Sequence, residues 1–124
     1  MWKMKSLALI IADEAPERLR TALVTAAAHV ALGGTARFFF QGASVKLLRA
    51  PLHDVDAERQ SAAGLPTLSQ LFEDGIGLGI RFAACQSSLP LWGLAVADCD
   101  PRVEWTGMIG FLATIEPGEQ MMVI

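Results

Sequence analysis

The chain has 124 residues, the size of one domain, and we treat residues 1–124 as a single unit. Hydrophobic residues make up 52% and charged residues 19%, which is more apolar and less charged than a typical soluble domain. The formal net charge of -3, with Lys and Arg scattered, argues against nucleic-acid binding. Because one small domain can hardly cover so much apolar surface, the composition predicts an oligomer.

The N-terminal region reads MWKMKSLALIIADE and predicts a buried β-strand over Lys5–Ala12. Its apolar run is too short for a secretory signal, and an acidic pair follows it at once. The longest apolar run elsewhere, LPLWGLAVA, is far shorter than a membrane span. We therefore expect a cytoplasmic location.

A helix follows in the segment DEAPERLRTALVTAAAHVALGG. Asp13 is suited to cap it, and Pro16 falls in its first turn. The apolar stripe at helical spacing consists of Leu19, Leu23, Ala26, Ala27 and Val30. This spacing leaves His29 on the flank of the helix, where we expect a surface or interface residue, and Gly33–Gly34 ends the helix.

The alternation of strand and helix continues to the C-terminus. We predict an aromatic strand over Thr35–Phe40, a short helix stopped by Pro51, and an irregular surface loop over 51–64. A helix over 65–75 leads to a third strand in IGLGIRFAA. After a short helix and a loop, the last helix is TGMIGFLATIEPG and the last strand is EQMMVI. A further strand could lie around Val103–Trp105.

This order predicts an α/β single-domain fold, a three-layer sandwich in which a mainly parallel sheet of about five strands carries helices on both faces. In such sheets, ligands gather at the carboxyl ends of the strands. The residues that this rule selects are Asp13 with Glu14, Gln41 with Gly42, and Cys85 with Gln86 and Ser87.

Cys85, in RFAACQSSLPLWGL, is the strongest candidate for chemistry. If the strand ends at Ala84, the thiol lies at the start of a helix, where free N–H groups and the helix dipole favour a thiolate. A buried structural thiol is the alternative. Cys99 is the contrast, because the neighbouring carboxylates of Asp98 and Asp100 disfavour a thiolate.

Four further features carry weaker signals. His53–Asp54 could be a base with an orienting partner, but it falls in the irregular loop. The glycines of Gly75–Gly79 close a helix and precede a strand, which is the reverse of a dinucleotide-binding fingerprint. Cys99 with its aspartates and a distant His makes a poor metal site, so we expect no metal. Trp105 could wall a pocket near Cys85.

The whole layout resembles the DsrE/DsrF-like family of small sulfur-relay proteins, which includes YchN-like and TusD-like branches. Four features carry the resemblance. They are LALIIADEAPERLRTALVTAAAHVALGG, RFFFQGASVKLL, a strand-end cysteine with a glycine eight residues later (Cys85 and Gly93), and WTGMIGFLATI followed by MMVI. Together they span nearly the full chain.

The resemblance implies trimers or hexamers, built from this chain alone or with paralogous subunits. It also implies that Cys85 carries sulfane sulfur as a persulfide between a donor protein and an acceptor thiol, with no metal or organic cofactor. Ser88 stands where some members have a second cysteine, which excludes a CxxC redox pair, and Pro90 shortens or kinks the expected helix.

We therefore expect a sulfurtransferase or sulfur carrier with Cys85 as the nucleophile. The pocket-lining residues would be Asp13, Gln41, Gly42, Gln86, Ser87 and Trp105. The alternative is a non-catalytic oligomeric binding or scaffold protein with Cys85 as a structural thiol. A thiol-dependent oxidoreductase or peroxidase is a third possibility, which the missing CxxC disfavours.

Overall fold

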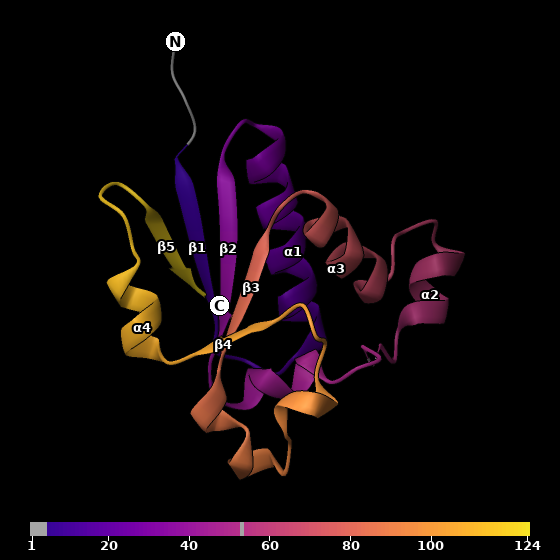
Figure 1. The fold of residues 1–124 in the computed structure, drawn as a ribbon. Helices are drawn as coiled ribbons and strands as arrows, with labels where there is room; N and C mark the ends of the chain where they lie inside the picture. The colour runs from indigo at the N-terminus through magenta and orange to yellow at the C-terminus, as the bar shows by residue number, and fades with distance from the viewer. Residues whose placement is uncertain (1–4, 53) are drawn as a thin grey trace.

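A computed structural model describes residues 5–52 and 54–124, so His53, in the predicted His53–Asp54 pair, lies outside the described residues. Five parallel strands form one sheet in the order β4–β3–β2–β1–β5 (Figure 1). The strands are β1 (Ser6–Ile11), β2 (Thr35–Phe40), β3 (Arg81–Cys85), β4 (Glu104–Thr106) and β5 (Gln120–Val123). The predicted α/β fold, including the strand expected near Val103–Trp105, is confirmed.

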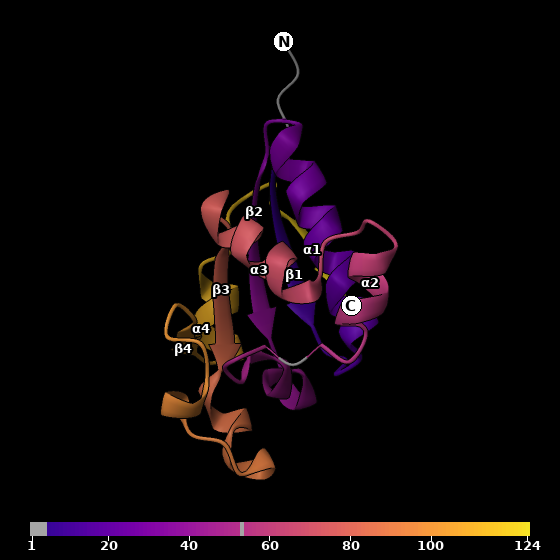
Figure 2. The same ribbon diagram turned by 90° about the vertical axis from the view of Figure 1, so that its right-hand side faces the viewer.

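Helices lie on both faces of the sheet (Figures 1 and 2). The α-helices are α1 (Pro16–Ala31), α2 (Ala57–Ala62), α3 (Leu68–Gly77) and α4 (Met108–Ala113). Short 3-10 turns occupy Gly42–Leu48, Gln86–Ser88, Pro90–Trp92 and Val96–Asp98. The helices α1 and α3 cover one face and α4 covers the other, and none of the described helices is long and apolar enough to cross a bilayer.

Alternating strand residues divide the core into two clusters. In β2, Phe38 and Phe40 belong to the larger cluster beneath α1 and α3, and Phe39 belongs to the smaller cluster beneath α4. Phe82 packs on Phe38 and on Phe72 of α3, with ring centroids 4.9 and 4.5 Å apart. Each fully buried side chain of this size stabilises the fold by about 1.5–3 kcal/mol. The larger cluster therefore holds most of the aromatic core.

The strands end in step at one edge of the sheet. Ile11 is the register partner of Phe40, and Phe40 is the register partner of Ala84. The backbone N–H of Gln41 donates to the carbonyl of Ile11 over 3.0 Å, which extends the pairing one residue further. This register places the residues that follow β1, β2 and β3 side by side.

His29 is buried, contrary to the prediction of a surface or interface residue. Its Nε2 donates to the carbonyl of Lys5, at the start of β1. Gly34 passes close to the same imidazole and leaves room for it because it has no side chain. Helical spacing alone could not show this, because the partners come from outside the helix.

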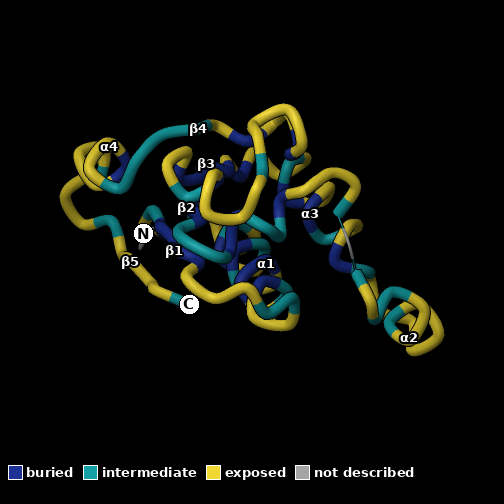
Figure 3. The backbone as a smooth tube through the Cα atoms, turned by 90° about the horizontal axis from the view of Figure 1, so that it is seen from below, coloured by how far each residue is buried: buried dark blue, intermediate teal, exposed yellow. Residues whose placement is uncertain are grey.

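Several predicted element boundaries are wrong. The helix predicted over 65–75 is Leu68–Gly77, so the third strand begins at Arg81 rather than at Ile76. The irregular loop over 51–64 contains α2, none of whose residues is buried (Figure 3). The N-cap of α1 is Ala15 rather than Asp13, whose Oδ1 instead accepts from the Ala15 N–H at 2.7 Å. The last helix ends at Ala113, well before the predicted stop at Pro117–Gly118.

Candidate functional site

The turns after β2 and β3 meet at the carboxyl edge of the sheet. The backbone N–H of Gly42 donates to Ser88 Oγ over 3.1 Å, which joins the two turns. Gly42 has a φ of 63°, a conformation that strongly favours glycine. The structure thus brings Gly42, Cys85 and Ser87 into one small region, as the strand-end rule predicts.

The other predicted pocket residues take different positions. Asp13 is exposed and bonds within its own turn, with Arg18 Nε 3.8 Å from its Oδ2. Gln86 is exposed, and no side-chain hydrogen bond to it is found within residues 5–52 and 54–124. Gln41 is half-buried, and its Oε1 is a buried oxygen without a partner in the described part of the chain. None of these three side chains contacts the Cys85 thiol through a hydrogen bond in that part.

Cys85 is the last residue of β3 rather than the first residue after it. Its side chain lies in the smaller cluster beneath α4, and the residue is 4% exposed. The Sγ lies 3.1 Å from Ser87 Oγ. The thiol is therefore buried on its apolar side and hydrogen-bonded on its polar side.

Opposing effects act on the pKa of Cys85. Burial is the largest single effect and raises the pKa. Hydrogen bonds from the hydroxyls and backbone N–H groups of Ser87 and Ser88 act together in the other direction, and they hold the pKa below the ordinary value for a cysteine. The net result favours a thiolate in a largely buried place.

The predicted helix after Cys85 is absent, and so is the dipole effect expected from it. Gln86–Ser88 is a single 3-10 turn, and Pro90–Trp92 is a second one. A continuous helix is interrupted because Pro90 has no N–H to donate, and Gly93 closes the second turn with a φ of 66°. Local hydrogen bonds, rather than a helix macrodipole, therefore stabilise the sulfur anion.

Cys99 has the opposite environment. It is 3% exposed and packs in the larger cluster, and its Sγ donates to the carbonyl of Ala95 at 3.8 Å. Burial, and then the charge of Asp98, raise the pKa of Cys99, and the charge of Arg49 only partly opposes them. The two thiols belong to different core clusters, so the fold does not pair Cys99 with Cys85 as a resolving cysteine.

Trp105 does not wall the Cys85 site. It is the register partner of Ala84 and packs against the larger cluster. Thr106 is the register partner of Cys85 and takes the place that the sequence assigned to Trp105. A one-residue change in register moves a side chain to the other face, and the sequence alone did not determine where β4 begins.

Ser88 and Phe111 are the functional neighbours that sequence reasoning missed. Ser88 was noted only as the residue replacing a second cysteine, although a hydroxyl three residues after a thiol at a tight turn can donate to it. Phe111 stacks on Phe39 with ring centroids 4.8 Å apart and belongs to the cluster of Cys85. No local pattern pointed to Phe111, because its contact depends on the tertiary fold.

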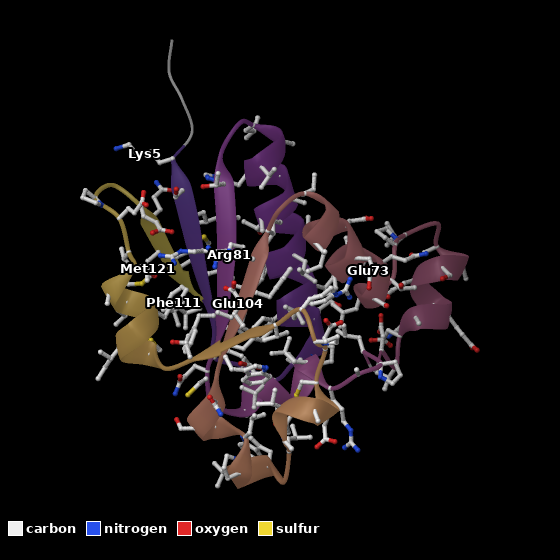
Figure 4. All side chains as sticks on the ribbon, viewed as in Figure 1. Lys5, Glu73, Arg81, Glu104, Phe111 and Met121 are labelled. Carbon is white, nitrogen blue, oxygen red and sulfur yellow. The ribbon has the colours of Figure 1, made fainter. Side chains whose placement is uncertain are left out.

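A cavity of about 230 Å³ adjoins the site on the α4 face. Figure 4 labels Arg81, Glu104 and Phe111 among its lining residues. Ala83 and Thr106 also line it, and they are the neighbours of Cys85 along β3 and across to β4. At the junction of β4 and α4, a Cβ on Gly110 would come within 2.7 Å of Thr106 Oγ1.

Among residues 5–52 and 54–124, no three His, Cys, Asp or Glu side chains are grouped as a metal site would require. No known family's sequence model matches the chain, and no curated protein matches it.

Two solved structures share the fold. The protein of unknown function MTH1491 from Methanobacterium thermoautotrophicum superposes with a TM-score of 0.73 at 15% identity, covering 97% of this chain and 99% of that chain. The ychN protein from E. coli superposes with a TM-score of 0.71 at 11% identity, covering 98% and 100%. The chain therefore has, over nearly its whole length, the DsrE/YchN-like fold that the sequence predicted.

Proposed function

We propose that this protein is a sulfur carrier that holds sulfane sulfur as a persulfide on Cys85 and passes it to a partner thiol. The observation that carries the proposal is the hydrogen-bonded thiol at the carboxyl end of β3. Hydrogen bonds from Ser87 and Ser88 hold the pKa of Cys85 below its ordinary value, although burial acts against them. A purely structural thiol needs no such donors, and Cys99 shows what burial does without them. The fold shared with the ychN protein is consistent with this function.

Loading is a nucleophilic displacement at sulfur. The Cys85 thiolate attacks the terminal sulfane sulfur of a persulfide or polysulfide donor, so that a new Sγ–S bond forms and the donor's S–S bond breaks. The electron pair of the broken bond leaves with the donor as a thiolate or shorter polysulfide. The product is a Cys85 persulfide anion, and no metal or organic cofactor takes part.

Unloading reverses the direction of attack. An acceptor thiolate attacks the outer sulfur of the persulfide, and the Sγ–S bond breaks. Its electron pair returns to Cys85 as a thiolate, which the Ser87 and Ser88 donors stabilise as a leaving group. The same hydrogen bonds thus assist both half-reactions.

Gly42 contributes through Ser88. Because Ser88 Oγ accepts the Gly42 N–H, its single hydroxyl proton is free to point at the sulfur. A hydroxyl that accepts one hydrogen bond is also a stronger donor in the next. We assign Gly42 and Ser88 positioning roles on this basis.

The test is sulfur loading of the reduced protein by sodium tetrasulfide, followed by intact mass and peptide mapping. The wild type and Cys99→Ser should gain the mass of one sulfur atom on Cys85, and Cys85→Ser should gain none. Transfer is then checked by adding a thiol acceptor and observing loss of the added mass. Loading of Cys99 instead, or of neither cysteine, would refute the carrier and leave the binding or scaffold protein as the better account.

We further propose that the carrier is a homo-oligomer in the cytoplasm, where thiols stay reduced. Apolar side chains are exposed along β5, namely Met121, Met122 and Val123. β5 is an edge strand that pairs with β1 alone, and exposed apolar edges are common sites of association. Light scattering coupled to gel filtration measures the assembly.

A further inference from the structure

Few residues pack over Cys85 on the α4 face of the sheet, and they form its cover. In the described part of the chain, α4 is the helix that packs on this face, and it is six residues long. Phe111 is its one buried residue, whereas Ile109 is 88% exposed. Met108 and Ile115 complete the packing at the two ends. A few side chains thus separate the thiol from solvent on this side.

Arg37 of β2 fastens this cover. Its Nε and Nη2 donate to the two carboxylate oxygens of Glu119, each at 2.9 Å, and its Nη1 donates to Thr114 Oγ1 at 2.6 Å. The guanidinium also lies over the Phe111 ring, 4.7 Å from its centroid. The Glu119 side chain is only 3% exposed, so little solvent screens the pair. One side chain therefore holds α4 and the segment that leads from it into β5.

The cavity beside the site lies under the same cover. Its lining includes Arg37, Ala83 and Thr106 from the sheet and Phe111 and Thr114 from α4 and its C-terminal end. Cys85 is the next residue after Ala83 on the same face of β3, and it is not among the residues that line the cavity.

We propose that α4 is a cover over Cys85 that is fastened by Arg37, and that its opening joins the adjoining cavity to the thiol and admits a sulfane-sulfur donor. Burial at 4% exposure protects the thiolate in the closed state, and release of the Arg37 contacts makes it reachable. That the admitted molecule is a sulfane-sulfur donor rests on the proposed function, whereas the opening of α4 does not.

The experiment measures the rate at which iodoacetamide alkylates Cys85 in the full chain, with Cys99 as an internal reference. The test variant is Arg37→Met, which keeps most of the apolar stem and removes the charged head. The matched control is Arg102→Met. Arg102 also donates to carboxylates, those of Glu73 and Asp100, and its guanidinium lies 5.5 Å from the Phe72 ring centroid, but it is on the side of the larger cluster.

Arg37→Met should raise the Cys85 alkylation rate by about tenfold or more, because α4 can then open locally without the cost of breaking the Arg37 hydrogen bonds. The Cys99 rate should stay unchanged in this variant, and Arg102→Met should leave the Cys85 rate unchanged. The cover is overturned if Arg37→Met leaves Cys85 as slow as in the wild type, or if both cysteines accelerate together as in general unfolding.

A second measurement needs no variant. In the wild type, local opening of α4 exposes little surface, so the Cys85 rate at low urea should depend weakly on urea. Tryptophan fluorescence gives the urea dependence of global unfolding. If the Cys85 alkylation rate depends on urea as steeply as global unfolding does, the proposal that α4 opens locally is refuted. Alkylation uses no sulfur donor, so the cover can hold even if tetrasulfide loading fails, and loading can succeed even if the cover is refuted.

Discussion

The two faces of the sheet differ in how their side chains pack. The face beneath α1 and α3 holds Phe38, Phe40 and Phe82, all essentially sealed from solvent. The face beneath α4 holds smaller side chains, among them Ala83 and Cys85, together with a cavity. The difference suggests a division in which the first face supplies stability, while the second keeps a cavity and a thiol whose pKa is lowered.

The cysteines follow the same division. On the large-core side, burial and Asp98 raise the pKa of Cys99. On the α4 side, burial raises the pKa of Cys85, but the serine hydrogen bonds more than offset this effect. Burial alone therefore does not decide the direction in which the pKa of a thiol shifts, because hydrogen-bond donors near the sulfur can outweigh it.

The largest expected effect is on stability. Phe82→Ala should lower the free energy of unfolding by about 3–5 kcal/mol, because it opens a large void between Phe38 and Phe72. Phe111→Ala should cost clearly less, since its ring packs at the margin of the fold. Urea unfolding measures both. Equal losses would show that the two faces contribute alike and would remove the distinction between them.

The second-largest expected effect concerns Glu119 and Asp100, the carboxylates that bind Arg37 and Arg102 on the two faces of the sheet. The hydrogen bond from Arg37, and to a lesser extent from the Glu116 backbone, holds the pKa of Glu119 below its ordinary value, although burial opposes this. A lowered pKa in the folded state means that this stabilisation is present at neutral pH and is lost as the pH falls through the folded pKa. Glu119→Gln should therefore cost about 2 kcal/mol at neutral pH and progressively less in acid.

Asp100→Asn provides the comparison for Glu119→Gln. In Asp100→Asn, Arg102 still binds a second carboxylate, that of Glu73. This substitution should therefore lower the free energy of unfolding by less than Glu119→Gln does. Urea midpoints from about pH 7 down to pH 3 measure both variants. A pH profile of Glu119→Gln that parallels the wild type would contradict the assigned role of Glu119.

The third effect sharpens the contrast between the thiols. Ser88→Ala removes a donor, so the pKa of Cys85 should rise and its alkylation at pH 7 should slow by about threefold to tenfold. Ser88→Thr should restore the rate, because it keeps the hydroxyl. The Cys99 rate should not change in either variant. The absorbance of the thiolate as a function of pH gives an independent measurement.

The smallest effect on stability, but a large one on assembly, is expected at exposed apolar positions. Met121→Asp on the edge strand β5, at a 51% exposed position, should change the free energy of unfolding by no more than about 1 kcal/mol and should reduce the oligomer to smaller species. Val24→Asp, at a 50% exposed position of α1, is the matched control and should leave assembly intact. The reverse outcome would move the interface to the α1 side.

The sequence was sufficient for the strands in chain order and for the position of Cys85 at a strand end, because buried strands and strand-end residues leave local patterns. It was insufficient where a contact joins distant segments. Phe111 over Phe39, the Gly42–Ser88 hydrogen bond and the burial of His29 against Lys5 are all of this kind. Trp105 was misplaced because the register of a three-residue strand has no sequence signal strong enough to set its face.

Gly110 has a consequence for the natural variation that this fold can accept. Since a Cβ there would come within 2.7 Å of Thr106 Oγ1, a larger residue at this position requires the Thr106 side chain to change its rotamer. Thr106 pairs with Cys85 in the sheet, so a substitution at position 110 would change the packing beside the thiol without touching it directly.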